Sequence, residues 1–198
     1  MTLWPSTNEW GIPDLLPDLQ GSIEPPVTIW GSIGRGRVMP GTWIFYTDDS
    51  RFAALARNPL PVPSSGCKRC GELNFSLFDS SPSAEALWAT YRKRCVSRAW
   101  QDRGIGILVD LNVPARHREV CMLGVPQGWR SFATRGYRDR LDELIDELRF
   151  ARSWGGSSSI TLVYGGGRLV EQICREHPGA AWIPDQTTEQ HRRHDVKG

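Results

Sequence analysis

The sequence predicts an α/β fold in which helices pack on a largely parallel sheet. Apolar runs typical of strands alternate with amphipathic stretches typical of helices over most of the 198 residues. The run GIGILVDLNV at 104–113 is almost continuously apolar, as in a strand that is covered on both faces. Many of the predicted strands end in polar residues, which favours a small or incomplete (β/α) barrel. An open doubly wound sheet is the alternative that the same pattern allows.

The chain is expected to consist of one domain with an extension at each end. Residues 1–29 hold five prolines and show little periodicity, so we expect an extended N-terminal arm laid over the domain. Its expected anchors are Trp4, Trp10, Leu15 and Leu16. A single α/β domain is expected over 30–186, and 187–198 form a polar tail.

The first half of the domain opens with a short apolar run at 27–30, followed by a glycine-rich loop. In chain order the elements predicted next are a strand at 41–49, a helix at 51–59, a strand at 72–78 and a long helix between Ser81 and Gly104. Aromatic and β-branched residues favour the strands, and Pro59 stops the short helix.

One face of the long helix is predicted to be buried, because its apolar residues recur at helical spacing. The expected buried face consists of Ala84, Leu87, Trp88, Tyr91, Cys95 and Ala99. The arginines of this helix lie mostly off that face; they are Arg92, Arg94, Arg98 and Arg103.

The second half continues the alternation. After the strand at 104–113, the predicted elements are short strands at 119–126 and 129–136, a helix at 138–154, a strand at 158–167, a helix at 168–179 and a last strand at 180–185. The residues of the first of these helices expected to face inward are Leu141, Leu144, Ile145, Leu148 and Ala151.

Composition is that of an ordinary globular protein, with 39% apolar and 23% charged residues. No run approaches the roughly 20 apolar residues that span a bilayer, and the N-terminus lacks the features of a secretory signal. We therefore expect a cytoplasmic protein without a membrane partner. The net charge of +2 gives no strong attraction to nucleic acid. Basic residues are almost all arginine, which reflects either codon usage in a GC-rich genome or selection for phosphate binding.

Polar residues at the ends of several predicted strands form the candidate site, because the carboxyl ends of parallel strands meet at one edge of a sheet. The set is Asp48, Asp49, Asn74, Asp110, Asn112, Arg135 and the glycine turn made by Gly165, Gly166 and Gly167. Asp48, Asp49 and Asp110 are predicted to hold a divalent cation. Arg135 and the glycine turn are predicted to hold phosphate. Asp49, Asp110, Asn112 and Arg135 are the candidate catalytic residues. The structural alternative is that these groups cap helices and fix loops.

Two further motifs carry weaker signals. The loop GSIGRGR at 31–37 places Arg35 and Arg37 among glycines, and such a loop is either a phosphate contact or simply solvated. Cys67 and Cys70 have the spacing of half a zinc site, with His117 and Cys121 as a conceivable second half. Cys95 and Cys174 lie on apolar helical faces, where thiols usually act as small apolar groups.

Several motifs together resemble a known family. They are WGS at 30–32, GTWIFYTDDSRFAAL at 41–55, ELNFSLF at 72–78, TYRKR at 90–94, GVPQGWRSFATRG at 124–136 and VYGGG at 163–167. Their order and spread resemble the family catalogued as domain of unknown function 4417, whose members occur in bacteria, phages and plasmids. The resemblance implies a mobile-element setting and carries no activity, and the Cys67/Cys70 pair is not part of the family pattern.

The sequence leaves three functions open. The first is a metal-assisted enzyme or binding domain that acts on the phosphate of a nucleotide or nucleic acid through the strand-end residues. The second is a non-enzymatic DNA- or RNA-binding accessory protein that uses the arginines of the 31–37 loop and of the long helix. The third is a protein-interaction module that uses the tryptophan-rich arm. No G-x-S-x-G, G-x-G-x-x-G or Walker motif supports a more specific chemistry.

Overall fold

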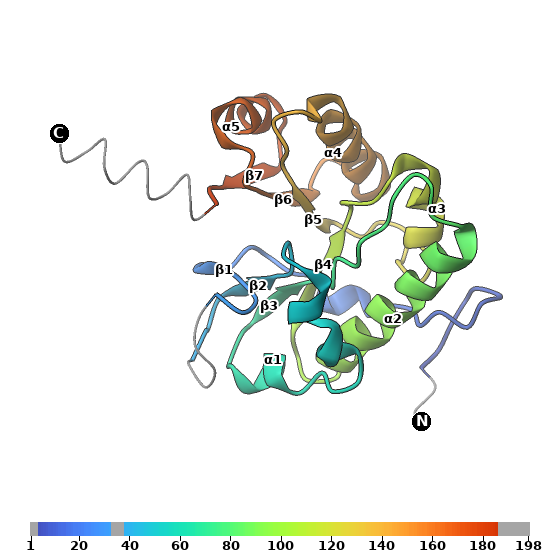
Figure 1. Cartoon of the computed structure of the whole chain (residues 1–198). Helices are drawn as coiled ribbons and strands as arrows, with labels where there is room; N and C mark the ends of the chain where they lie inside the picture. Colours follow the sequence, from blue (N-terminus) through green and yellow to red (C-terminus); the bar gives the residue numbers. More distant parts are fainter. Residues whose placement is uncertain (1–3, 33–37, 186–198) are drawn as a thin grey trace.

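The computed structural model describes residues 4–32 and 38–185. Its parallel sheet has seven strands in the order of the sequence, and it curls into a half barrel (Figure 1). The strands are β1 (Val27–Ile29), β2 (Thr42–Ile44), β3 (Arg69–Gly71), β4 (Gly106–Asp110), β5 (Ser131–Arg135), β6 (Ile160–Tyr164) and β7 (Ala180–Ile183). The α/β class and the barrel-like architecture are thus confirmed. A doubly wound sheet would require a reversal of strand order, and the order here is sequential.

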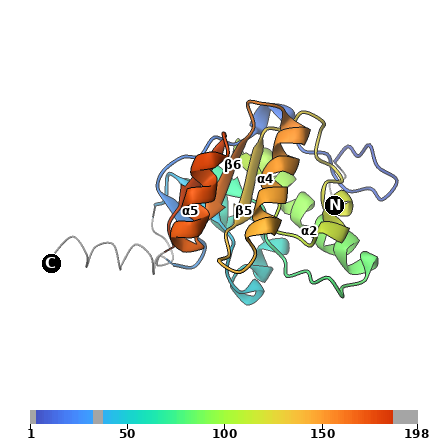
Figure 2. The same ribbon diagram turned by 90° about the horizontal axis from the view of Figure 1, so that it is seen from above.

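Helices cover the outer, convex face of the sheet. They are α1 (Pro61–Ser64), α2 (Ser83–Gln101), α3 (Arg118–Cys121), α4 (Leu141–Gly155) and α5 (Gly167–Glu176). Short 3-10 turns occur at η1 (Pro17–Leu19), η2 (Asp49–Arg51), η3 (Ala53–Ala56) and η4 (Ala115–His117). Figure 2 shows α4 and α5 side by side on the outer face of β5 and β6. No helix in the described ranges combines the length and apolar character that a membrane crossing requires.

The curl divides the core into an inner and an outer part, because successive residues of a strand face opposite sides. The inner cluster lies inside the half barrel and consists of Ile44, Tyr46, Leu108, Ala133, Leu162 and Tyr164. The outer clusters pack the sheet against the helices, as Val109 and Phe132 do on the α2 side and Val163 does on the α4 and α5 side. Inward-facing positions at the strand ends therefore point into the mouth of the half barrel.

Three local predictions were wrong. The segment at 72–78 is not a strand, because the chain leaves the sheet after Gly71. The segment at 119–126 begins with α3 instead of forming a strand. The helix predicted at 51–59 is replaced by the 3-10 turns η2 and η3. Each segment connects two strands, and side-chain hydrogen bonds decide its conformation more than local propensity does.

The buried face of α2 differs from the predicted one. Trp88 is 60% exposed, whereas Lys93, Arg94 and Trp100 are buried. Of the six residues expected to face inward, Ala99 alone is buried. The helix is rotated because its polar residues meet buried acids at the ends of β3 and β4, as described below.

The N-terminal arm packs across the amino-terminal side of the domain. Leu15 is buried and its N–H donates to the carbonyl of Gly124, while the N–H of Gly21 donates to the carbonyl of Ile107 in β4. Trp4 is anchored by a hydrogen bond from Nε1 to Asp102. Trp10, a predicted anchor, is instead 55% exposed. The side chain of Leu16 is also exposed, although its backbone N–H bonds to α2.

Candidate functional site

Asp110 is the last residue of β4 and lies at the centre of the polar site. Its carboxylate is 2% exposed and accepts hydrogen bonds at both oxygens. Oδ1 accepts from the Tyr46 hydroxyl (3.3 Å) and the Asn112 N–H (3.2 Å), and Oδ2 accepts from Asn74 Nδ2 (3.0 Å). The ammonium of Lys93 lies 3.6 Å from Oδ2. Burial raises the pKa of Asp110, although Lys93 and Asn74 act in the opposite direction.

A second buried acid, Glu72, extends this centre towards α2. Arg94 binds Glu72 Oε1, and Ser97 Oγ donates to the same oxygen. Glu72 Oε2 accepts the backbone N–H of Asp110 (3.2 Å) and lies 3.9 Å from Lys93. Burial alone would raise the pKa of Glu72, but Arg94 and Lys93 outweigh it and the pKa is lowered. Two acids and two bases thus neutralise one another inside the protein, as a buried ionic cluster must.

The segment after β3 is fixed to its neighbours by side chains of the predicted set. Asn74 donates to the carbonyl of Asn112 (3.1 Å), and Asn112 Nδ2 donates back to Asn74 Oδ1 (3.2 Å). Asp49 accepts from the backbone N–H and the hydroxyl of Ser76. Asp48 is exposed. Asp49, Asn74 and Asn112 therefore position loops at the carboxyl edge of the sheet.

Arg135 ends β5 and lies half-buried at the mouth of the half barrel. Its Nη1 donates to the carbonyl oxygen of Tyr46 (3.4 Å). The ring of Tyr46 stacks on that of Tyr164 at a centroid distance of 6.4 Å. The guanidinium carbon of Arg135 lies 5.2 Å from the ring centroid of Tyr137. Burial and then Asp110 raise the pKa of Tyr46 well above its ordinary value, so this hydroxyl remains a donor.

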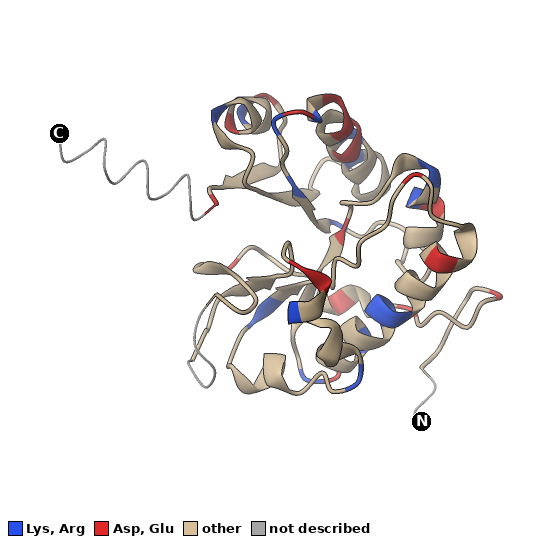
Figure 3. Cartoon of the chain, viewed as in Figure 1, with Lys and Arg blue, Asp and Glu red and all other residues tan. Residues whose placement is uncertain are grey.

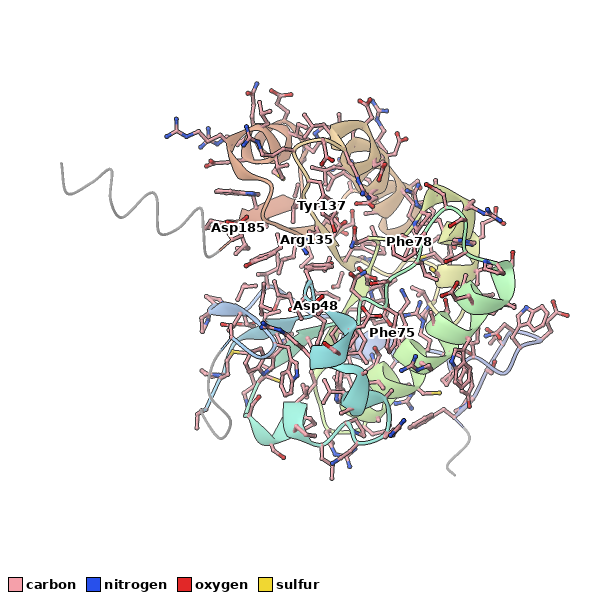
Figure 4. The ribbon with its side chains drawn as sticks, viewed as in Figure 1. Asp48, Phe75, Phe78, Arg135, Tyr137 and Asp185 are labelled. Carbon is pink, nitrogen blue, oxygen red and sulfur yellow. The ribbon has the colours of Figure 1, made fainter. Side chains whose placement is uncertain are left out.

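The carboxyl edge of the sheet has two sides (Figure 4). Arg135, Tyr137 and Asp185 lie on the side formed by β5, β6 and β7. Asp48 and Phe75 lie on the side formed by the segments after β2 and β3. Arg135, which is predicted to bind phosphate, and Asp48, which is predicted to bind a cation, thus lie on opposite sides of the same edge.

The glycine turn connects β6 to α5 beside Arg135. Gly165, Gly166 and Gly167 all have positive φ angles, between 73° and 79°, which residues other than glycine rarely adopt. A Cβ on Gly166 would lie 2.8 Å from the carbonyl carbon of Gly136, so the turn packs directly on the end of β5. No acidic residue occupies the first turn of α5.

The predicted residues are partly brought together. Asp110, Asn74 and Asn112 form one hydrogen-bonded group, and Tyr46 connects this group to Arg135 through its hydroxyl and its carbonyl. Asp49 belongs to the same edge through its hydrogen bonds to Ser76, and it is not hydrogen-bonded to Asp110. The catalytic, phosphate-binding and metal-binding roles of these residues stay predictions.

Sequence reasoning missed three members of the site: Tyr46, Lys93 and Glu72. Tyr46 lies two residues after Ile44, and residues at this spacing in a strand face the same side, so the alternation could have placed Tyr46 on the inward face. Lys93 is one of the chain's few lysines, at 68, 93 and 197. A charged residue inside a helix gives no signal of burial by itself, since charges usually mark a solvated face.

Two of the four long-helix arginines expected in a nucleic-acid footprint are buried, whereas Arg92 is half-buried and Arg103 is exposed. Arg94 is fully buried and Arg98 is 7% exposed, so neither presents its guanidinium to a ligand. Arg35 and Arg37 lie outside the described residues.

The cysteine pair lies in the outer core. Cys67 and Cys70 are both buried free thiols, and burial raises the pKa of each. Cys121 accepts a hydrogen bond from Thr90, and the two ring nitrogens of His117 are buried without a hydrogen-bond partner among the described residues. Within 4–32 and 38–185, no group of three or more His, Cys, Asp or Glu side chains is placed to hold a metal ion. Zinc at the cysteines stays a prediction.

A surface hollow lies at the opposite, amino-terminal edge of the sheet. Among the residues that line it are Arg149, Arg152, Ser159, His177 and Gly179. None of the predicted site residues lines this hollow.

Comparison with known proteins gives a family and one curated relative. A family model described as "Domain of unknown function (DUF4417)" matches residues 4–146. The "Gene 1 protein" of Mycobacterium phage D29 is 31% identical over 134 residues, which are 63% of this chain and 48% of that protein. The chain thus matches about half the length of this relative. No solved structure matches the chain.

Proposed function

Since the chain belongs to the family described as "Domain of unknown function (DUF4417)", whose description names no activity, we propose a function from the geometry of the carboxyl edge. This edge binds a phosphate-bearing ligand, either a nucleotide or a segment of nucleic acid. Arg135 is the principal contact, and the amino end of α5 is the second.

The observation that supports this proposal is the state of the Arg135 guanidinium. It carries five donors, of which one makes a long bond to the carbonyl of Tyr46. No ion pair of Arg135 occurs among the described residues. A half-buried cation at the mouth of a half barrel, with donors to spare, suits a phosphate because guanidinium binds phosphate in a bidentate manner.

The amino end of α5 supports the same ligand. The backbone N–H groups of the first turn have no side-chain cap, and none of the residues of that turn is acidic. The carboxylate of Asp185 lies beside Gly165, the first glycine of the turn. Gly166 packs on Gly136, the residue after Arg135. The Arg135 guanidinium and the N–H groups at the amino end of α5 therefore lie at the same edge of the sheet.

The buried ionic cluster positions this site and does not itself contact the ligand. Asp110 uses both carboxylate oxygens inside the protein, and Asp49 does so at Ser76. Of the three acids predicted to hold a divalent cation, Asp48 is exposed, Asp49 is half-buried and Asp110 is buried. The divalent cation stays a prediction, and we expect it to bind together with the phosphate of the ligand.

Substitution of Arg135 tests the proposal. We expect Arg135→Ala to weaken the binding of a nucleoside 5′-monophosphate roughly 10- to 100-fold, the range for a charge-assisted hydrogen bond. Arg135→Lys should recover part of the loss, because the charge stays while the planar fork is removed. Calorimetric titration with AMP, and separately with inorganic phosphate, measures the effect.

Arg149→Ala is the matched control, because Arg149 is an exposed arginine of α4 that pairs with Asp146. It should leave the affinity unchanged. Absence of measurable binding to the wild-type chain, or an equal loss in both alanine variants, would refute the proposed site.

A further inference from the structure

Tyr137 lies between β5 and α4 and holds two arginines on its ring. The guanidinium carbon of Arg135 lies 5.2 Å from the ring centroid, and that of Arg140 lies 5.0 Å from it. Contacts of this kind order side chains that would otherwise sample many rotamers. The ring therefore brings two cations together at the carboxyl edge of the sheet.

Neither cation is neutralised by an ion pair within the described ranges. Figure 3 shows basic and acidic residues alternating along this loop, where Asp139 stands between Arg138 and Arg140. Two like charges held on one ring repel each other, and a ligand with two linked negative groups relieves that repulsion.

Acidic residues at the start of α4 restrict how such a ligand binds. Asp142 and Glu143 occupy the first turn of α4 and are both exposed. The amino end of α4 is therefore a poor place for an anion, in contrast to that of α5. Binding at the β5–α4 loop must therefore depend on arginine side chains, of which Arg135 and Arg140 are held on the Tyr137 ring.

We infer that Arg135, Tyr137 and Arg140 form a clamp for two linked phosphates, with Tyr137 as the spacer that orders both arginines. This inference rests on the proposed function and narrows its ligand class. A nucleoside di- or triphosphate carries linked phosphates, and so does a nucleic-acid strand. In the clamp, Arg135 holds the phosphate nearer the mouth and Arg140 holds the next one.

The test compares ligands that differ in their number of phosphates. AMP, ADP and ATP are titrated into the whole chain, together with a single-stranded oligonucleotide. ADP and ATP should bind roughly 10-fold more tightly than AMP, the gain expected from one further charge-assisted contact. Arg140→Ala should abolish this gain and leave the affinity for AMP unchanged, whereas Arg135→Ala weakens every ligand.

Two variants of Tyr137 test its role as the spacer. Tyr137→Phe should retain the preference for linked phosphates, because the ring face remains. Tyr137→Leu should lose it, because no ring then holds the two arginines together. Arg149→Ala again serves as the control for the loss of an exposed arginine.

The oligonucleotide distinguishes the two sources of linked phosphates. If it binds more tightly than ATP, with the same dependence on Arg140 and a logarithmic salt slope near −1.4, the clamp holds a strand through about two phosphates. If it binds no more tightly than AMP while ATP does, the clamp holds a free nucleotide.

Equal binding of AMP, ADP and ATP, with no tighter binding of the oligonucleotide, overturns the clamp and leaves the proposed site at Arg135 standing. Loss of AMP affinity in Arg140→Ala also overturns it, because both arginines would then hold one phosphate. If no ligand binds, the clamp and the proposed function are both refuted.

Discussion

Glu147 is a buried acid on α4 whose environment favours its protonated form. It accepts a hydrogen bond from Thr134, and its side chain lies near Arg118. The pKa of Glu147 is raised to about 8, mainly by burial; Asp110 and Glu143 also raise it, whereas Thr134 and Arg118 lower it. The acid is therefore mostly neutral in the folded protein at pH 7.

The pH dependence of stability follows from this shift. Below the ordinary pKa of 4.5 both the folded and the unfolded chains are protonated at Glu147. Between there and pH 8 unfolding releases a proton, so stability falls as pH rises, by up to about 1.4 kcal/mol per pH unit from this one group. Glu147→Gln should be more stable than wild type at pH 8, by on the order of 3 kcal/mol, and nearly equal to it at pH 5.

Urea unfolding at pH 5 and pH 8 measures the difference. Glu176→Gln, an exposed change in the last turn of α5, should show little change at either pH. A stability difference for Glu147→Gln that is the same at both pH values would contradict the raised pKa.

At the residue scale, the sequence predicted which polar residues belong to the site better than it predicted which residues they contact. Asp110 stood out because a carboxylate interrupting an apolar strand requires a partner. The partner, Lys93, lies on a helix where a charge is ordinarily solvated, and Tyr46 is an aromatic that resembles any other core residue. Tertiary contacts decide which of these residues becomes the partner of Asp110, and the periodicity of the sequence carries no information about such contacts.

At the element scale, α2 has an aromatic residue on each of two faces. Trp100 is fully buried, stacks on Phe45 at 5.6 Å and donates to the carbonyl of Pro59. Trp88 is 60% exposed and stacks on Tyr91 at 5.8 Å. Spacing alone favoured the Trp88 face as core, because that face carries more apolar residues. The helix instead turns Lys93 and Arg94 towards Glu72 and Asp110, since an unpaired buried acid costs more than an exposed tryptophan.

The two tryptophans should respond differently to alanine. Trp100→Ala removes a buried ring and a buried hydrogen bond, so we expect a loss of about 3–5 kcal/mol in the free energy of unfolding. Trp88→Ala should cost less than about 1 kcal/mol, because it removes mainly one surface stacking contact. Chemical denaturation of both variants measures the two losses of unfolding free energy. Comparable losses would mean that the Trp88 face is covered in solution.

At the scale of the whole molecule, the buried ionic cluster joins elements far apart in the chain. Glu72 follows β3, Arg94 lies on α2, and Asp110 ends β4. Arg94 also donates to the carbonyls of Cys121 at the end of α3 and of Leu123 beyond it. One guanidinium thus connects the sheet to two helices.

Arg94→Met should therefore destabilise the entire domain. The substitution leaves Glu72 charged and buried with one base fewer, and we expect a loss of about 3–5 kcal/mol. Arg175→Met provides a control, because Arg175 is an exposed arginine paired with Glu171 on α5. Thermal unfolding of both variants checks this, and a loss below 1 kcal/mol for Arg94→Met would show that the cluster contributes little.

The architecture could be predicted where strands and helices alternate cleanly, as from β5 to β7. It could not be predicted from residue 49 to residue 78, where Asp49, Ser76 and Asn74 direct the chain by side-chain hydrogen bonds. Such bonds have no period, so they leave no pattern for sequence reasoning to detect.

Sequential strand order has a consequence for how the protein is made. Every strand pairs with the strand synthesised just before it, so the sheet can grow at one edge during translation, and no later strand has to insert between two earlier ones. The arm is the exception, since Gly21 binds Ile107 and Leu15 binds Gly124. Those early residues must wait until more than a hundred others have left the exit tunnel, and the first part of the chain to be translated is among the last to settle.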